Sequence, residues 1–143
     1  MARQAKLMLD DWDRFTAAVE RKPQKVTAVD LFAEQCLKLG LPKFEREVLF
    51  AKAAVQRLWR FDFGFRAYLV AVEIEGIVPR RIGREFVAGG RHGSVAGIIE
   101  DMDKYNTAAL LGWTVLRFPQ KYVKPHRAIE MTMQVLKARG WAP

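Results

Sequence analysis

The chain has very little cysteine and histidine, and this limits its metal chemistry. Cys36 is the only cysteine among 143 residues, so no disulfide can form within the chain and no multi-cysteine zinc site can be built. A metal ion would have to be held by oxygen ligands or by histidine. No histidine can be argued as a partner for Cys36, so we do not expect it to be a nucleophile.

Long apolar segments are also absent. No apolar run approaches the roughly 18 residues that a membrane span requires. The first residues, MARQAKLMLDDWDRF, lack the apolar core of a signal peptide. We therefore expect a soluble, cytoplasmic protein with no membrane partner.

Acidic residues are outnumbered by basic ones. The chain has 24 Lys and Arg against 16 Asp and Glu, a formal net charge of +8. Such a chain is suited to a polyanion such as nucleic acid, through attraction to phosphate and release of counterions. Many basic proteins bind no nucleic acid, so charge by itself only favours this class of partner.

The first forty residues show helical spacing. Apolar residues recur at intervals of three and four in a segment that ends before Pro23: Met8, Trp12, Phe15 and Val19. Thr27 followed by Asp30 is a helix start signal, and Gly40 ends this second helix. We predict a helical extension over residues 1–25 and a core over residues 26–139, together forming a single domain.

Apolar strands follow these helices. Residues 47–55, EVLFAKAAV, predict one strand, and the alternating residues 60–75, RFDFGFRAYLVAVEIE, predict two strands joined at Arg66 and Ala67. Residues 113–118, WTVLRF, predict a buried strand whose aromatic residues belong to the core.

Two more helices complete the predicted order. Ser94 can cap a helix that ends at Gly112 and carries an apolar stripe: Val95, Ile98, Ile99, Met102 and Tyr105. Pro125 suits the first turn of a last helix that ends at Arg139. The order α, α, β, β, β, α, β, α indicates a mixed α/β fold.

The segment from Gly76 to Ser94 is rich in glycine and arginine, which predicts a flexible basic loop. Its arginines and two lysines before the last helix are candidate contacts for a DNA backbone: Arg80, Arg81, Arg84, Arg91, Lys121 and Lys124. His92 stands just ahead of a helix N-terminus, a place suited to phosphate. An ordinary surface role for His92 and for the lysines stays open.

The predicted hairpin gathers acids on one face. A turn centred between Arg66 and Ala67 pairs Phe61 with Val72, and it makes Asp62 a diagonal neighbour of Glu73. The apolar face then carries Phe61, Phe63, Phe65, Val70, Val72 and Ile74, and the other face carries Asp62, Ala71, Glu73 and Glu75. This parity depends on the length of the turn.

Clustered carboxylates have two explanations. They can be solvated on the wet face of a sheet, which is the commoner case. They can also bind Mg²⁺ or Mn²⁺ while leaving water sites open, as hydrolysis of a phosphodiester requires. Surrounding arginines would then bind the phosphate backbone.

Four short motifs, in their order and spacing, carry a resemblance to a known family. The runs RFDFGF, VEIEG, GRHGS and DKYNTAALLGWTVLRF resemble phage and bacterial members of the PD-(D/E)XK nuclease superfamily, near its very-short-patch-repair-like endonuclease branch. The similarity spans residues 28–136. It implies a restriction-endonuclease-like αβββαβ core with a mixed sheet flanked by helices, plus the extra N-terminal helix.

The resemblance also implies a function and a site. It makes the chain a metal-dependent DNA endonuclease from a phage or bacterium, with Mg²⁺ or Mn²⁺ as cofactor. Asp62 stands at the family's metal-binding aspartate, Glu73 at the following acid, and Glu34 at the acid of the first core helix. His92 gains a candidate role as acid, base or phosphate contact.

One departure concerns the catalytic lysine. The position usually filled by lysine, two residues after the second acid, holds Glu75. Glu75 could bind metal or take a proton from water, while Lys104 could supply the positive charge. A non-catalytic DNA-binding module with the same fold, a structure-selective enzyme for branched DNA, and a homodimer that cuts both strands all stay open.

Overall fold

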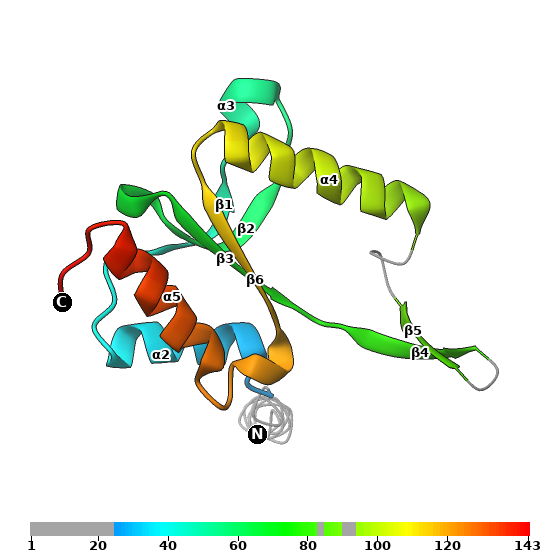
Figure 1. Cartoon of the computed structure of the whole chain (residues 1–143), viewed down its shortest axis with the longest axis horizontal. Coiled ribbons are helices and arrows are strands. Elements are labelled where there is room, and N and C mark those ends of the chain that lie inside the picture. Colours follow the sequence, from blue (N-terminus) through cyan, green and yellow to red (C-terminus); the bar gives the residue numbers. More distant parts are fainter. Residues whose placement is uncertain (1–24, 83–84, 90–93) are drawn as a thin grey trace, which may run out of the picture.

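The computed structural model describes the backbone of residues 25–82, 85–89 and 94–143, and the side chains of residues 25–77 and 94–143. The predicted first helix lies outside these residues. At the centre is a four-stranded mixed sheet with the order β1-β2-β3-β6 (Figure 1). Its strands are β1 (Glu45–Leu49), β2 (Arg60–Phe65), β3 (Val70–Glu75) and β6 (Thr114–Pro119). β2 is antiparallel to both β1 and β3, and β6 is parallel to β3.

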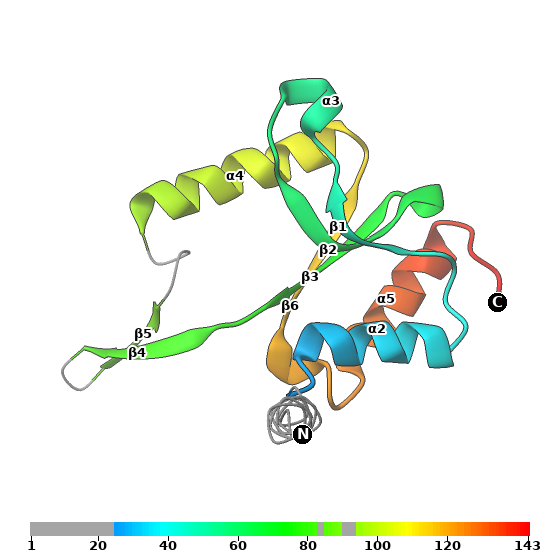
Figure 2. The same ribbon diagram turned by 180° about the vertical axis from the view of Figure 1, so that it is seen from behind.

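Helices cover both faces of this sheet. The helices α2 (Ala28–Lys38) and α5 (Arg127–Ala138) lie on one face, and α4 (Val95–Leu110) lies on the other (Figures 1 and 2). Short elements connect them: α3 (Lys52–Val55) and the 3₁₀ turns η1 (Arg66–Tyr68) and η3 (Gln120–Tyr122). The mixed α/β architecture with flanking helices therefore agrees with the prediction.

Two apolar clusters fill the spaces between the sheet and the helices. The larger one contains Phe32 of α2, Phe63 and Phe65 of β2, and Ile129 and Leu136 of α5, all fully buried. The smaller one lies on the α4 side, around β1, the start of β2 and Ala108 of α4. The sheet is thus covered on both sides, and side chains alternate between two cores rather than between core and water.

The predicted helix caps are confirmed. Thr27 accepts a hydrogen bond from the backbone N–H of Asp30, and the Asp30 side chain accepts one from Thr27, so a capping box starts α2. Ser94 accepts from the N–H of Gly97 at the start of α4. Gly112 follows α4 with φ of +83°, a conformation that glycine adopts without steric cost.

The predicted hairpin has the right parity and the wrong register. Phe63 pairs with Val72, and the chain turns through Arg66–Leu69, so the loop is longer than the two residues predicted. Continuing this register by one residue places Asp62 opposite Glu73 instead of diagonal to it. The shift is an even number of residues, which is why the acids still share a face.

Phe61 corrects the predicted apolar face. Its ring stacks on Phe50 at 3.9 Å between centroids and belongs to the α4-side cluster, whereas Phe63 and Phe65 pack under α2 and α5. The pairing of β2 with β3 begins only at Phe63. Phe61 therefore lies beyond the part of β2 that is held on both edges.

The strand predicted over residues 47–55 is shorter and begins earlier. β1 ends at Leu49, and Lys52–Val55 form a helical turn instead. Alanines in that stretch allow either conformation, and apolar content alone does not separate a strand from a helix.

The segment predicted as a flexible basic loop contains a β-ribbon. β4 (Val78–Ile82) and β5 (Glu85–Gly89) form a two-stranded antiparallel sheet that extends away from the central sheet, on the side toward which α4 also points (Figures 1 and 2). Ladder pairing supplies the backbone hydrogen bonds that a loop would leave to water.

The apolar stripe predicted on α4 is largely exposed. Val95 is 75% exposed and Met102 is 58% exposed, and Ala108 is the buried residue of the helix. The N-terminal half of α4 reaches past the central sheet, which leaves much of this stripe uncovered (Figure 1). In the described part of the chain, no helix is long and apolar enough to span a membrane.

Candidate functional site

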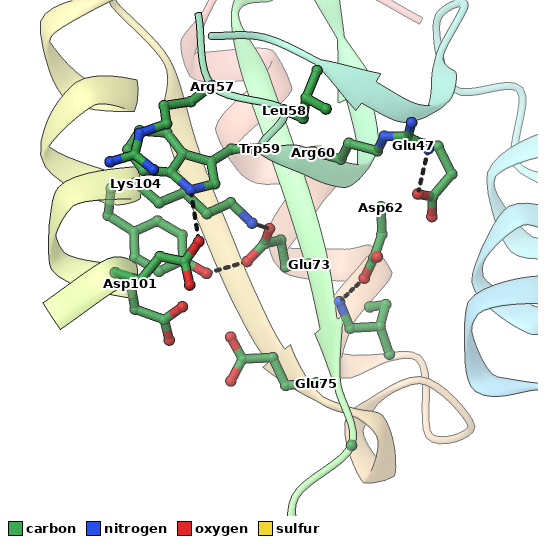
Figure 3. A pocket seen from close by; sticks show the side chains of 14 residues that line it. Glu47, Arg57, Leu58, Trp59, Arg60, Asp62, Glu73, Glu75, Asp101 and Lys104 are labelled. Carbon is green, nitrogen blue, oxygen red and sulfur yellow. Dashed lines mark hydrogen bonds and ion pairs between the residues drawn. The ribbon is translucent and has the colours of Figure 1, made fainter. Parts of the chain in front are cut away.

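A cavity of about 580 Å³ lies on the α4 side of the sheet, at the carboxyl end of β3 (Figure 3). Its floor carries the acids of β2 and β3. One wall comes from β1 and the segment before β2, and the other comes from α4. The lining residues are Glu47, Arg57, Leu58, Trp59, Arg60, Asp62, Glu73, Ile74, Glu75, Gly76, Glu100, Asp101, Lys104 and Tyr105. The structure thus brings together Asp62, Glu73, Glu75 and Lys104 from the sequence prediction.

Asp62 is a half-buried acid on the cavity floor. Its Oδ2 accepts a hydrogen bond of 2.7 Å from the backbone N–H of Ile74. Burial raises the pKa of Asp62, and the negative charges of Glu73 and Glu47 add to this effect, while the Ile74 bond opposes it. Within the described residues, no basic side chain forms an ion pair with Asp62.

Glu73 is held by two residues of α4. Its side chain is only 10% exposed, and its two carboxylate oxygens accept from the Lys104 ammonium and the Tyr105 hydroxyl, one each (Figure 3). Burial and the adjacent Glu73 carboxylate raise the pKa of Tyr105, so its hydroxyl stays protonated. Lys104 therefore places a positive charge against the acid opposite Asp62.

Glu75 is held by Arg117 of β6. The guanidinium of Arg117 contacts the Glu75 carboxylate, lies 3.7 Å from Asp101, and sits 4.3 Å above the Tyr105 ring. The three acids of the floor are thus unequal: Glu73 and Glu75 have basic partners, and Asp62 has a backbone donor. Asp62 is the group with the greatest need for a cation.

Glu34 does not join the site. It lies on α2, on the opposite face of the sheet, where its exposed carboxylate pairs with Lys38 at 2.7 Å. The i,i+4 spacing on one helix explains this pairing. The structure therefore does not bring Glu34 together with the other predicted metal ligands.

The predicted DNA contacts that the structure describes come from β4 and from the segment around η3. Arg80 and Arg81 are on β4, and Lys121 and Lys124 are exposed beside η3, just beyond the end of β6. Arg84, Arg91 and His92 are outside the described residues. Of these candidates, Lys121 and Lys124, whose side chains the structure describes, do not line the cavity.

Several lining residues were not predicted. Glu47 faces the cavity from β1 and has φ of +52°, a left-handed conformation that is uncommon for a non-glycine residue and is often found near functional sites. The helical spacing predicts a core position for Tyr105, and the sequence assigns no role to Trp59, yet both line the cavity. The sequence offers one local signal for the α4 wall of the cavity: Glu100 and Lys104 are four residues apart and therefore lie on the same side of the helix.

The donors present are oxygen atoms suited to a hard divalent cation. Mg²⁺ commonly binds through one or two carboxylates and completes its shell with water and phosphate oxygens. Asp62 and its neighbour Glu73 supply that number. The described residues contain no group of three His, Cys, Asp or Glu side chains close enough to enclose an ion by themselves.

Chain comparisons add no assignment: no protein-family model, curated protein or solved structure matches this sequence.

Proposed function

We propose that the chain is a metal-dependent DNA endonuclease whose metal ligands are Asp62 and Glu73. The observation that carries the proposal is the unneutralised Asp62, half-buried beside two other acids in an open cavity of a basic chain. Burial, with the repulsion from Glu73 and Glu47 added to it, raises the pKa of Asp62, and a divalent cation would offset both effects.

The fold supports the same proposal. Its elements α2, β1, β2, β3, α4 and β6 follow the αβββαβ order of a restriction-endonuclease-like core, and the β4–β5 ribbon is an insertion in that order. The acids fall on the second and third strands, as the resemblance to PD-(D/E)XK nucleases implies. The fold by itself would not establish the chemistry.

The residues divide the work of phosphodiester hydrolysis. A divalent ion bound at Asp62 and Glu73 would polarise the phosphate and favour ionisation of an attacking water. Lys104 balances the negative charge that gathers on the phosphate, in place of the lysine that Glu75 replaces. Arg117 keeps Glu75 oriented at the cavity edge, where it can accept a proton from water.

The test is cleavage of supercoiled plasmid in Mg²⁺ or Mn²⁺ by the wild type and by Asp62→Asn. We expect the substitution to lower the rate by at least about a hundredfold, because it removes a charged metal ligand. Glu34→Gln is the matched control, since Glu34 is an exposed acid remote from the cavity, and it should cut at the wild-type rate. Equal cutting by wild type and Asp62→Asn would contradict the proposal.

The alternative, a non-catalytic DNA-binding module with this fold, predicts different behaviour. The wild type and Asp62→Asn would then bind DNA equally well in the presence of a chelator, and neither would nick plasmid in Mg²⁺ or Mn²⁺.

A further inference from the structure

The segment between α3 and β2 forms a wall of unusual composition beside the acids. Gln56 ends α3 in a left-handed conformation, with φ of +54°, and the next residues turn over the cavity: Arg57, Leu58 and Trp59. The Arg57 guanidinium lies 5.4 Å from the Trp59 ring centroid. Leu58 is 67% exposed at the cavity mouth. This wall therefore places a guanidinium, an indole and an apolar side chain beside the acids on the cavity floor.

The Trp59 ring is held in place from two sides. It packs against the α4-side apolar cluster, and its indole N–H donates to Glu100 of α4 at 3.3 Å. The indole therefore connects one wall of the cavity to the other, above the contact between Lys104 and Glu73 (Figure 3). At this point the hydrogen bond between Trp59 and Glu100 closes the gap between the two walls.

The closed gap between the two walls determines which nucleic acids can enter the cavity. A double helix cannot enter a gap that a single indole side chain bridges, so a paired base beside the scissile phosphate would stay outside the wall. An unpaired base can enter edge-on and stack on a guanidinium or an aromatic ring, which is the usual way that proteins hold single strands.

We propose that Arg57 and Trp59 form a stacking site for an unpaired base next to the scissile phosphate, and that the preferred substrate is single-stranded DNA or the unpaired strand of a branched DNA. This inference rests on the proposed nuclease function and narrows its substrate. Arg57 stacks between Trp59 and the base, and Leu58 contacts the next base at the mouth.

The experiment measures binding without cleavage. The full chain is titrated, in Ca²⁺, with a labelled single strand, a blunt duplex of the same sequence, and a duplex with a short unpaired flap. We expect the single strand and the flap to bind about tenfold more tightly than the blunt duplex, which is the size of effect that one stacked base gives. A 2-aminopurine placed in the flap should lose fluorescence on binding.

Three variants separate stacking from a merely structural role. Trp59→Ala should lose the preference and the 2-aminopurine quenching, whereas Trp59→Phe keeps a ring without the indole N–H and should retain most of both. Arg57→Ala should weaken flap binding. Lys52→Ala, an exposed cation on α3 that does not line the cavity, should behave as wild type.

Several outcomes would overturn the inference. These are equal binding of blunt duplex and flap, an unchanged preference in Trp59→Ala, or identical losses in Trp59→Phe and Trp59→Ala, which would show that only the bond to Glu100 matters. Tighter binding of a single-stranded RNA of the same sequence would assign the wall to RNA instead.

The outcome for the wall is separable from the outcome for the metal site. Asp62→Asn should keep the preference for unpaired DNA, because it leaves the wall intact. If Asp62→Asn loses cleavage and the Arg57 and Trp59 variants bind DNA as wild type does, the stacking inference is contradicted and the nuclease proposal is not. If the Arg57 and Trp59 variants lose binding and Asp62→Asn still cuts DNA, the role of the acids in cleavage is contradicted and the stacking inference is not.

Discussion

Asp62 is held in an environment that opposes its charge. It is half-buried and two acids lie near it, and the backbone N–H of Ile74 and the charge of Lys104 compensate only in part, so the pKa of Asp62 is raised. A group whose charged form is disfavoured in the folded state lowers the stability of the protein whenever it is ionised. A loss of stability that a bound cation would reverse is typical of functional residues.

The Asp62→Asn variant should therefore be more stable than wild type at pH 7 without divalent ions. Below the ordinary value of 3.8, Asp62 is protonated in both folded and unfolded chains, and no difference arises. As pH rises from 3.8 through the raised pKa of the folded state, the unfolded chain ionises first, so the wild type loses stability. Asn keeps an oxygen to accept from Ile74.

Urea unfolding at several pH values checks this expectation. Mg²⁺ should reverse the order at pH 7, because it binds the wild type: a concentration of 100 times the dissociation constant adds about 2.7 kcal/mol. Glu34→Gln should show neither effect. A wild type that is the more stable protein in chelator at pH 7 would contradict the account of Asp62.

At the scale of elements, the position of β1 against β2 depends on one glycine. A Cβ added to Gly64 would lie 2.8 Å from Val48 Cγ2, closer than real side chains approach. The Val48 side chain is buried in the α4-side cluster, and its backbone is part of β1. Because both are packed, the Val48 side chain has little room to move away from an added Cβ. Gly64 thus lets the edge strand that carries Glu47 lie close to β2.

Gly64→Ala should lower the free energy of unfolding by about 1–3 kcal/mol, the usual cost of overpacking a core. Gly76→Ala is the control, because no atom lies within 4 Å of its added Cβ, and it should change stability by less than about 0.5 kcal/mol. Both are measured by urea unfolding. The cost of Gly64→Ala should fall when Val48 is also replaced by Ala, and an unchanged cost would exclude the contact as its cause.

At the scale of the whole molecule, a basic chain contains an acidic cavity. The chain carries a net charge of +8, yet the floor of the cavity holds three carboxylates that share one face. The β4–β5 ribbon, which carries Arg80 and Arg81, extends away from the sheet (Figure 1). We expect the ribbon to contact the DNA backbone at a distance from the cut.

Replacing both Arg80 and Arg81 by Ala should weaken DNA binding similarly for all sequences. Each lost phosphate contact should reduce the slope of log K against log salt by about 0.9, so the double variant should change it by up to about 2. Fluorescence anisotropy at several salt concentrations measures this slope. Lys137→Ala, an exposed cation on α5, should leave it unchanged, and an unchanged slope in the double variant would rule out the ribbon as a phosphate contact.

The sequence by itself determined the local features of this protein. The Thr27–Asp30 capping box, the Ser94 cap and the stop at Gly112 each depend on hydrogen bonds or backbone freedom within a few residues. The shared face of Asp62, Glu73 and Glu75 depends on the two-residue period of the strands and on the parity of the turn between them. The predicted register was wrong by an even number of residues, so the three acids still share a face.

The tertiary structure alone decided which groups meet these acids. Lys104 and Tyr105 reach Glu73 across 31 and 32 residues of sequence, and Arg117 reaches Glu75 across 42. Such contacts depend on where α4 and β6 lie over the sheet, which no local period specifies. For the same reason the sequence contained no indication of Glu47 and Trp59, whose positions follow from strand pairing and from the turn after α3. The family resemblance assigned Glu34 to the site, and the structure places it on the opposite face of the sheet.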